Sequence, residues 1–145
     1  MPVVSLTRDI SAPAADIFEL LARPDRHPVV DGSGSVRSAQ PDGPERLSAG
    51  VRFGMNMKIG APYKILNTVV EFEEGRRIAW RHFGGHVWRW LLEPIDEGHT
   101  RVTEQFDPTT ARSPLLLKLI SAERRNRPSI AASLDRLQQW AEPRG

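Results

Sequence analysis

Cysteine is absent from this 145-residue sequence, and tyrosine occurs only once, at Tyr63. A chain without cysteine cannot form a disulfide bridge, a thiolate metal site or a cysteine nucleophile. No apolar run approaches the roughly 20 residues that a transmembrane helix needs, and residues 1–6 do not resemble a signal peptide. We therefore expect a cytoplasmic protein with no stable membrane insertion, folded as one domain over residues 1–145.

An excess of charge of one sign is also lacking. The 20 basic residues are nearly balanced by 18 acidic ones, which leaves a formal net charge of +2. The basic residues are scattered, often beside acids as in residues 71–77, whereas nucleic-acid-binding proteins usually gather them on one face. The densest basic group, Arg124, Arg125 and Arg127, fits a solvated helix face. We therefore expect no nucleic acid among the partners.

Proline divides the first third of the sequence into short elements. Alternating apolar residues over residues 2–10 predict a strand, and Pro13 suits the first turn of an amphipathic helix that follows it. Pro24 and Pro28 leave room for only a short second helical piece. Residues 31–50 are rich in Gly, Ser, Pro and Asp and predict a connection that holds one short strand.

A period of two governs residues 51–107, with turn residues at regular intervals, and this pattern predicts antiparallel strands. Three-residue loops at 74–76, 83–85 and 96–98 gather the apolar residues on one face and pair opposite charges on the other. The predicted cross-strand pairs are Val70–Trp80, Glu73–Arg77, Trp80–Trp88, His82–His86, Trp88–Phe106, Trp90–Glu104, Leu92–Val102 and Glu93–Arg101. The sheet is therefore expected to bury one concave face.

A helix is predicted for the last segment, beginning near Ser113 and Pro114. Its core-facing stripe consists of Ile130, Leu134, Leu137 and Ala141. Pro128 should kink this helix because the Arg124 carbonyl loses its hydrogen-bond donor. The apolar residues of 115–120 wrap most of the helix circumference, so they either plug a cavity mouth or meet a partner or a membrane.

Three stretches carry a resemblance to a known family. They are ISAPAADIFELL at 10–21, IAWR at 78–81 and LEPIDEGHTRVTE at 92–104. Together with the order of predicted elements, they resemble the polyketide cyclase/dehydrase branch of the START-like (SRPBCC) superfamily. The resemblance implies an α+β helix-grip fold. In that fold a curved antiparallel sheet of about six or seven strands wraps around a long C-terminal helix, with two short helices after the first strand.

The resemblance also implies a hydrophobic cavity between the sheet and the long helix. Members of the superfamily bind or carry lipids, sterols, polyketides, quinones and plant metabolites, and a minority catalyse reactions. The sequence departs from the family pattern at Pro128, within the long helix, and in its single tyrosine. The second departure weakens any mechanism that needs a tyrosine acid in the cavity.

Four polar residues fall on the predicted apolar face: Thr68, His82, His86 and Glu104. A buried carboxylate is costly unless it is paired, so Glu104 should have a raised pKa or a cationic partner. It could then act as a general base or accept a hydrogen bond from a ligand, or it could simply lie at a wet rim. Since His86 lies roughly 13 Å from Glu104 along the strand, no metal site is expected.

The predicted ligand-lining residues come from this face and from the last helix. They are Met55, Met57, Thr68, Val70, Trp80, His82, His86, Trp88, Trp90, Glu104, Phe106, Leu116 and Ile120. Trp80 is expected in the core, and Trp88 and Trp90 in the cavity wall. The two methionines suit an adaptable pocket.

Three functions are open from the sequence. The first is non-catalytic binding or transport of a hydrophobic small molecule (a lipid, polyketide or aromatic metabolite), without a cofactor. The second is a cyclase, dehydratase or aromatase that uses Glu104 with His82 or His86 as acid and base. The third is an interaction module, or a homodimer, formed through residues 115–120. We favour the first because acid–base residues on the apolar face are few.

Overall fold

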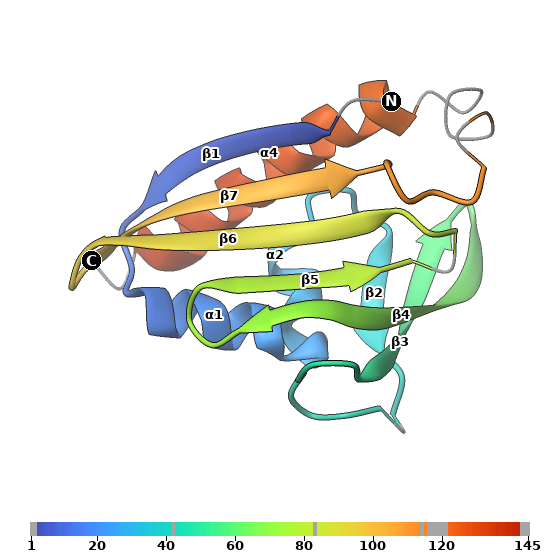
Figure 1. Cartoon of the computed structure of the whole chain (residues 1–145), viewed down its shortest axis with the longest axis horizontal. Coiled ribbons are helices and arrows are strands. Elements are labelled where there is room, and N and C mark those ends of the chain that lie inside the picture. The colour runs from blue at the N-terminus through green and yellow to red at the C-terminus, as the bar shows by residue number, and fades with distance from the viewer. Residues whose placement is uncertain (1–2, 42, 83, 114, 116–121, 143–145) are drawn as a thin grey trace.

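In the computed structural model, seven strands form one antiparallel sheet in the order β1-β7-β6-β5-β4-β3-β2 (Figure 1). The structure describes residues 3–41, 43–82, 84–113, 115 and 122–142. The strands are β1 (Val4–Ile10), β2 (Val36–Ala39), β3 (Arg52–Ile59), β4 (Ala61–Glu73), β5 (Arg77–Arg81), β6 (Val87–Asp96) and β7 (His99–Asp107). The predicted open antiparallel sheet is confirmed.

The helices lie together behind the sheet in the view of Figure 1. They are α1 (Ala14–Ala22), the short 3-10 helix η1 (Pro24–Arg26), α2 (His27–Val30) and the long C-terminal α4 (Ala122–Ala141). α4 packs mainly on β1 and also on β7 and α2. This is the helix-grip arrangement that the sequence resemblance implied. No helix within the described residues is both long and apolar enough to cross a bilayer.

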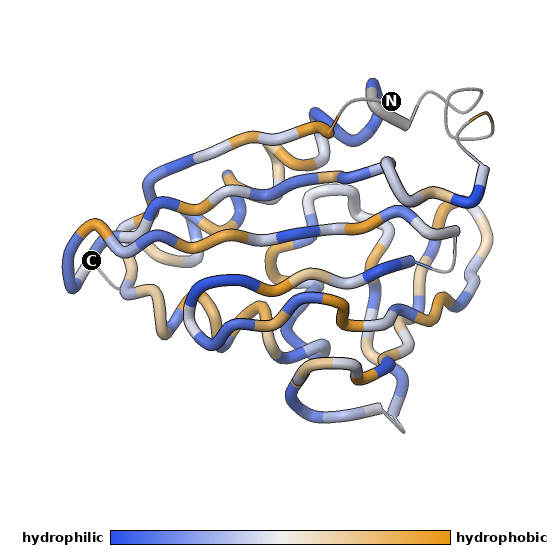
Figure 2. Tube along the Cα trace, in the orientation of Figure 1, coloured by the Kyte–Doolittle hydropathy of each residue, from blue (hydrophilic) through white to orange (hydrophobic). Residues whose placement is uncertain are grey.

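Hydrophobic and hydrophilic residues alternate along β6 and β7 (Figure 2), and this alternation sets the register of the central sheet. Trp88 pairs with Phe106, Trp90 with Glu104, Leu92 with Val102 and Glu93 with Arg101, and Trp80 pairs with Trp88. These predicted pairs are confirmed. The turn after β6 differs from the predicted three-residue loop, because a bulge at Ile95 brings Asp96 opposite His99.

A second bulge, in β4, overturns part of the predicted lining. Glu73 pairs with Arg77 as predicted, but the register shifts between Val69 and Glu71, so that Val69 rather than Val70 lies opposite Trp80. The extra residue, Val70, reverses the side on which the preceding residues of β4 point. Asn67 and Val69 are therefore buried, and the prediction that Thr68 and Val70 line the cavity is wrong.

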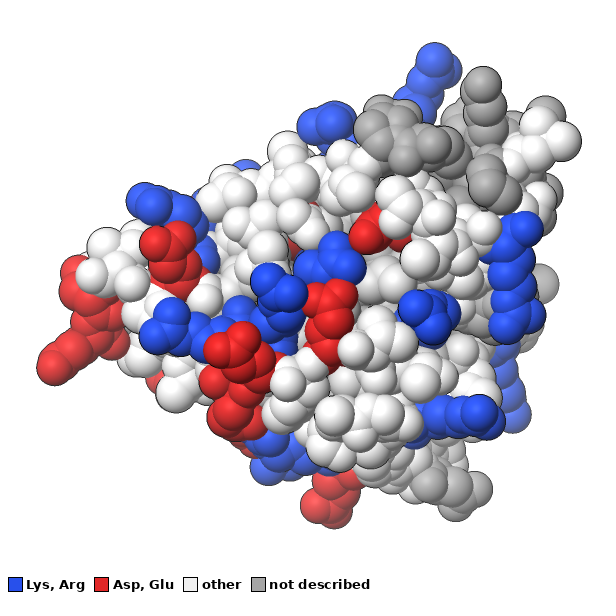
Figure 3. All heavy atoms as spheres, in the orientation of Figure 1, with Lys and Arg blue, Asp and Glu red and all other residues white. Residues whose placement is uncertain are grey.

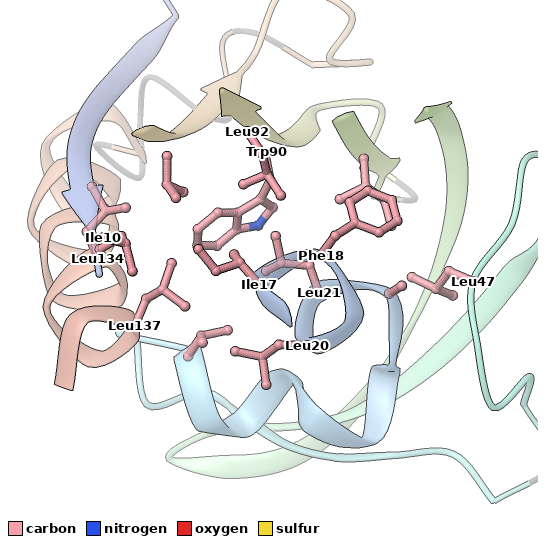
Figure 4. Close-up of a cluster of buried hydrophobic side chains, with 14 of the residues drawn as sticks. Ile10, Ile17, Phe18, Leu20, Leu21, Leu47, Trp90, Leu92, Leu134 and Leu137 are labelled. Atoms are coloured by element: carbon pink, nitrogen blue, oxygen red, sulfur yellow. The ribbon is translucent and has the colours of Figure 1, made fainter. Parts of the chain in front are cut away.

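The core occupies one end of the space between the sheet and the helices (Figure 4). Side chains of α1 point toward Trp90 there, and the predicted stripe of α4 closes the cluster from the other side. The stripe residues Ile130, Leu134, Leu137 and Ala141 are at most 1% exposed. Their spacing of three and four residues places them on one helix face, which explains why α4 stays on the sheet.

The outer face of the sheet carries ion pairs in place of apolar residues. Arg89 donates to Glu71 Oε2 at 2.7 Å and to Asp107 Oδ2 at 3.2 Å, and Arg77 donates to Glu71 Oε1 at 3.1 Å. Basic and acidic side chains are interspersed across the middle of this face (Figure 3). This part of the surface therefore offers no patch of one sign for a nucleic-acid backbone.

The C-terminal helix continues through Pro128. The ring of Pro128 has no N–H for the Arg124 carbonyl, and Ser129 turns its hydroxyl back to the Arg125 carbonyl at 3.1 Å. The predicted roles of Leu116, Ile120 and the dimer-forming segment 115–120 lie outside the described residues, apart from Leu115, which is 68% exposed.

Candidate functional site

A cavity of about 740 Å³ lies between the concave face of the sheet, α2 with its following loop, and α4. Its wall comprises Leu21, His27, Val30, Asp31, Ser33, Gly34, Ser35, Val36, Met55, Met57, Lys58, Ile59, Tyr63, Ile65, Asn67, Trp80, His82, His86, Trp88, Trp90, Glu104, Phe106, Arg125, Asn126, Ser129 and Ser133. The packed core of Figure 4 borders the cavity, since Leu21 and Trp90 belong to both.

Aromatic rings line the sheet side of the cavity. Phe106, Trp88 and Trp80 lie opposite one another across β7, β6 and β5, and the rings of Trp88 and Phe106 are 5.1 Å apart. Trp88 and Trp90 line the cavity as predicted, and Trp90, at 3% exposure, also belongs to the core. Trp80, predicted to lie in the core, is only partly buried and packs against it. All three tryptophans nevertheless contact the cavity.

Glu104 reaches the same cavity from β7 and is 6% exposed. Burial raises the pKa of its carboxyl well above the usual range, and the negative charge of Asp31 raises it further. Its Oε2 has no hydrogen-bond partner among the described residues. Of the two predicted alternatives, the raised pKa is therefore found, and a cationic partner is not found among the described residues. A protonated carboxyl is a hydrogen-bond donor, so the raised pKa of Glu104 favours an acid over the predicted base.

His82 and His86 face each other across the turn after β5, as predicted. Their rings stack with centroids 4.5 Å apart, and the backbone N–H of Gly84 donates to His82 Nδ1 at 3.2 Å. Burial lowers the pKa of both rings, and for His86 the neighbouring His82 adds to the effect and the pKa falls to about 4. Both imidazoles are therefore neutral at physiological pH and can accept hydrogen bonds.

Asn67 joins this histidine pair from β4, and the sequence pattern missed it. Thr68 pairs with Arg81, so the next residues along, Asn67 and His82, are neighbours in the register. Asn67 is 3% exposed, and its Oδ1 has no partner within the described part of the chain. The alternation did not predict this position, because no residue type in β4 indicates the bulge at Val70.

His27 is a second cavity residue that the alternation could not reveal, because it lies on α2. Its Nε2–H donates to the Leu21 carbonyl at 2.8 Å, and its ring stacks on Trp80 at 4.9 Å with an interplanar angle of 21°. Burial lowers the pKa of this imidazole as well. In the sequence, His27 lies between Pro24 and Pro28 of a short helical segment. The prolines restrict the backbone there, but they do not indicate what the histidine side chain contacts.

The loop after α2 closes the helix side of the cavity. Asp31 accepts hydrogen bonds from the Ser33 hydroxyl at 2.7 Å and from the Val36 N–H at 3.1 Å, which order the loop into β2. Gly32 lies directly on α4, where its N–H donates to Ser133 Oγ at 2.9 Å. A Cβ at Gly32 would come within 2.3 Å of the Ser133 nitrogen, so only glycine permits this approach.

Of the predicted lining residues, nine contact the cavity: Met55, Met57, Trp80, His82, His86, Trp88, Trp90, Glu104 and Phe106. Thr68 and Val70 do not, and Leu116 and Ile120 lie outside the described residues. Within the described residues, no group of three His, Asp or Glu side chains is placed to hold a metal ion. The arrangement suits a bound organic molecule with few polar contacts.

Comparison with known sequences agrees with this geometry. A profile of the family described as "Polyketide cyclase / dehydrase and lipid transport" matches residues 1–142. The chain belongs to this family. The chain is also 41% identical over 105 residues to the uncharacterized protein Rv0088 of Mycobacterium tuberculosis, a match that covers 72% of the chain. The same match covers 46% of Rv0088, so the chain spans about half the length of this curated relative.

Solved structures share the fold of this family member. Protein NE0264 from Nitrosomonas europaea superposes with a TM-score of 0.72 at 15% identity, over 98% of this chain and 95% of that one. The di-domain ARO/CYC StfQ from the steffimycin biosynthetic pathway superposes with a TM-score of 0.64 at 18% identity, over 98% of this chain and 51% of that one. At such identities the likeness concerns the fold alone.

Proposed function

We propose that the chain binds a hydrophobic small molecule in the cavity between the sheet and α4. The observation that carries the proposal is the size and lining of this cavity. Its volume of about 740 Å³ lies within the roughly 300–1,000 Å³ typical of small-molecule sites. Trp80 and Trp88 supply flat apolar surface, and Met55 and Met57 supply side chains that adapt to different shapes.

The proposal is tested by filling the cavity. Ile65 lines it, whereas the adjacent Leu66 is 50% exposed, so Ile65→Trp and Leu66→Trp add the same bulk to neighbouring residues of β4. We expect the wild type and Leu66→Trp to bind the uncharged apolar dye N-phenyl-1-naphthylamine, and Ile65→Trp to bind it about tenfold more weakly. Equal binding by all three proteins would contradict the proposed site.

Native mass spectrometry provides a second readout. A molecule carried over from the expression host would appear as an adduct on the wild type and on Leu66→Trp. The same adduct should be depleted on Ile65→Trp, because its extra ring occupies the space between the sheet and α4. Circular dichroism of both variants checks that the fold is retained.

A cyclase or dehydratase reaction is the second candidate, favoured by the protonation states in the cavity. The raised pKa of Glu104 favours a protonated acid, and the lowered pKa of His86, about 4, favours an uncharged base on the same wall. They act on different atoms of a substrate, since Trp90, the partner of Glu104, is four residues or about 13 Å along β6 from His86. A confirmed substrate whose turnover is unchanged in Glu104→Gln would rule out this role.

A further inference from the structure

Three residues of the cavity wall each carry a buried polar atom that no described residue satisfies. They are Asn67 Oδ1, His86 Nδ1 and Glu104 Oε2. Buried polar atoms are almost always hydrogen-bonded, because an unpaired one loses its contact with water without compensation. Each of these atoms sits at the end of a terminal torsion with a broad, nearly two-fold profile, so a modest rotation presents it to a bound molecule.

These three residues form two polar ends of the cavity. His86 and Asn67 flank His82 in one row across β6, β5 and β4. Glu104 forms the other end, beside Trp90 on β6 and in electrostatic contact with Asp31. The two ends are about 13 Å apart along the strands, which is the length of two or three fused or linked rings.

Flat rings occupy the wall between the two ends. Trp88 lies midway on β6, with Phe106 and Trp80 on either side of it. A planar aromatic molecule placed here would stack on indole and phenyl faces along its length. A flexible aliphatic chain would gain apolar contact but would leave the polar atoms at both ends unpaired.

The charges around the cavity disfavour an ionised ligand at either end. At one end the negative charge of Asp31, which also raises the pKa of Glu104, would repel a carboxylate. At the other end burial keeps His86 neutral, so it offers no positive charge. The cationic side chains of the wall, Lys58 and Arg125, are solvent-exposed.

We infer that the cavity is built for a flat, uncharged molecule that carries a hydrogen-bonding oxygen near each end. One oxygen pairs with Glu104 and the other with His86 and Asn67. This inference rests on the proposed function, because it specifies the class of ligand for the same cavity. A hydroxyl donates to His86 and Asn67 at one end, and a second hydroxyl or a ketone oxygen pairs with Glu104 at the other, whereas a fatty acid carries a charge and has no second oxygen at the required spacing.

The test compares four rigid probes by equilibrium dialysis against the wild-type chain: trans-stilbene, its para-hydroxy and para,para′-dihydroxy derivatives, and its para,para′-dicarboxylate. In a merely apolar cavity each hydroxyl weakens binding, because it loses its hydration. In a cavity with two polar ends, each hydroxyl should strengthen binding about fivefold. The dicarboxylate should bind at least about tenfold more weakly than the dihydroxy probe.

A variant locates the effect at one end. His86→Phe keeps a ring against His82 and Phe106 but removes the unpaired nitrogen. It should remove most of the advantage of the second hydroxyl, because Asn67 alone then remains to pair with it at that end. The matched control His99→Phe alters an exposed histidine on the β6–β7 turn and should bind all four probes as the wild type does.

The outcomes separate this inference from the proposed function. If trans-stilbene binds as tightly as the dihydroxy probe, or if the dicarboxylate binds best, the inference is overturned and the hydrophobic cavity remains. If neither the stilbenes nor the apolar dye bind the wild type, the proposed function itself fails.

Discussion

The stacked histidine pair should make the stability of the fold depend on pH. Burial and the neighbouring His82 lower the pKa of His86 from 6.5 to about 4. In the unfolded chain this imidazole takes up a proton below about pH 6.5, whereas in the folded chain it resists protonation until about pH 4. The contribution of His86 is therefore complete above pH 6.5 and is lost as the pH falls toward 4.

The size of this effect follows from the shift. One pKa unit corresponds to about 1.4 kcal/mol, so the full shift corresponds to about 3 kcal/mol. The ring of His86 retains some contact with solvent, which reduces the expected contribution to about 2 kcal/mol. Replacing His86 by Phe keeps the ring stack and removes the titration.

The assay is urea unfolding of the wild type and of His86→Phe, followed by tryptophan fluorescence, near pH 7.5 and near pH 4.5. The wild type should lose about 2 kcal/mol more free energy of unfolding between these conditions than the variant does. His99→Asn, on the exposed turn, should keep the wild-type dependence. Equal losses in the wild type and His86→Phe would show that the folded chain does not hold this imidazole neutral.

Two further predictions concern the wall of the cavity. The pKa of Glu104 is raised by burial and by Asp31, so folding favours its protonated form and stability falls as the pH rises above about 4.5. Glu104→Gln should abolish this fall. The melting temperature of the variant should therefore rise relative to that of the wild type as the pH is raised from acid to neutral. Gly32→Ala places a Cβ 2.3 Å from the Ser133 nitrogen and 2.5 Å from the Ser129 oxygen, and should lower the free energy of unfolding by about 3 kcal/mol. In the control Gly34→Ala the added Cβ meets no atom within 4 Å, and only the positive φ of 73° is unfavourable. This variant should lower the free energy of unfolding, measured by chemical denaturation, by about 1 kcal/mol.

The central sheet could be predicted from the sequence because its register has few solutions. The pairing of Trp90 with Glu104 and of Trp80 with Trp88 follows once the turns are placed, since a shift by one residue would turn Trp88, Trp90 and Leu92 to the outer face of the sheet. The raised pKa of Glu104 follows from the same reasoning. Alternation therefore predicts best where one face of a strand is buried along its whole length.

The rest of the site could not be predicted because it depends on contacts distant in sequence. His27 and Asp31 enter the cavity from α2 and its loop, whose position is set by packing on α4. Asn67 was assigned to the wrong side of β4, since nothing in the local sequence marks the bulge at Val70. The roles of the three tryptophans depend on where α1 fills the space behind the sheet, which periodicity does not describe.

The bulge at Val70 also has a consequence for how this lining can change during evolution. Residues of β4 before the bulge follow the opposite parity from those after it, relative to the face of the sheet. A change that closed the bulge with Val70 retained would slip the preceding half of β4 by one residue and exchange Asn67 for Thr68 and Ile65 for Leu66 along the cavity. Such a slip could thus alter ligand specificity more than several point substitutions, because it exchanges the inner and outer surfaces of half a strand at once.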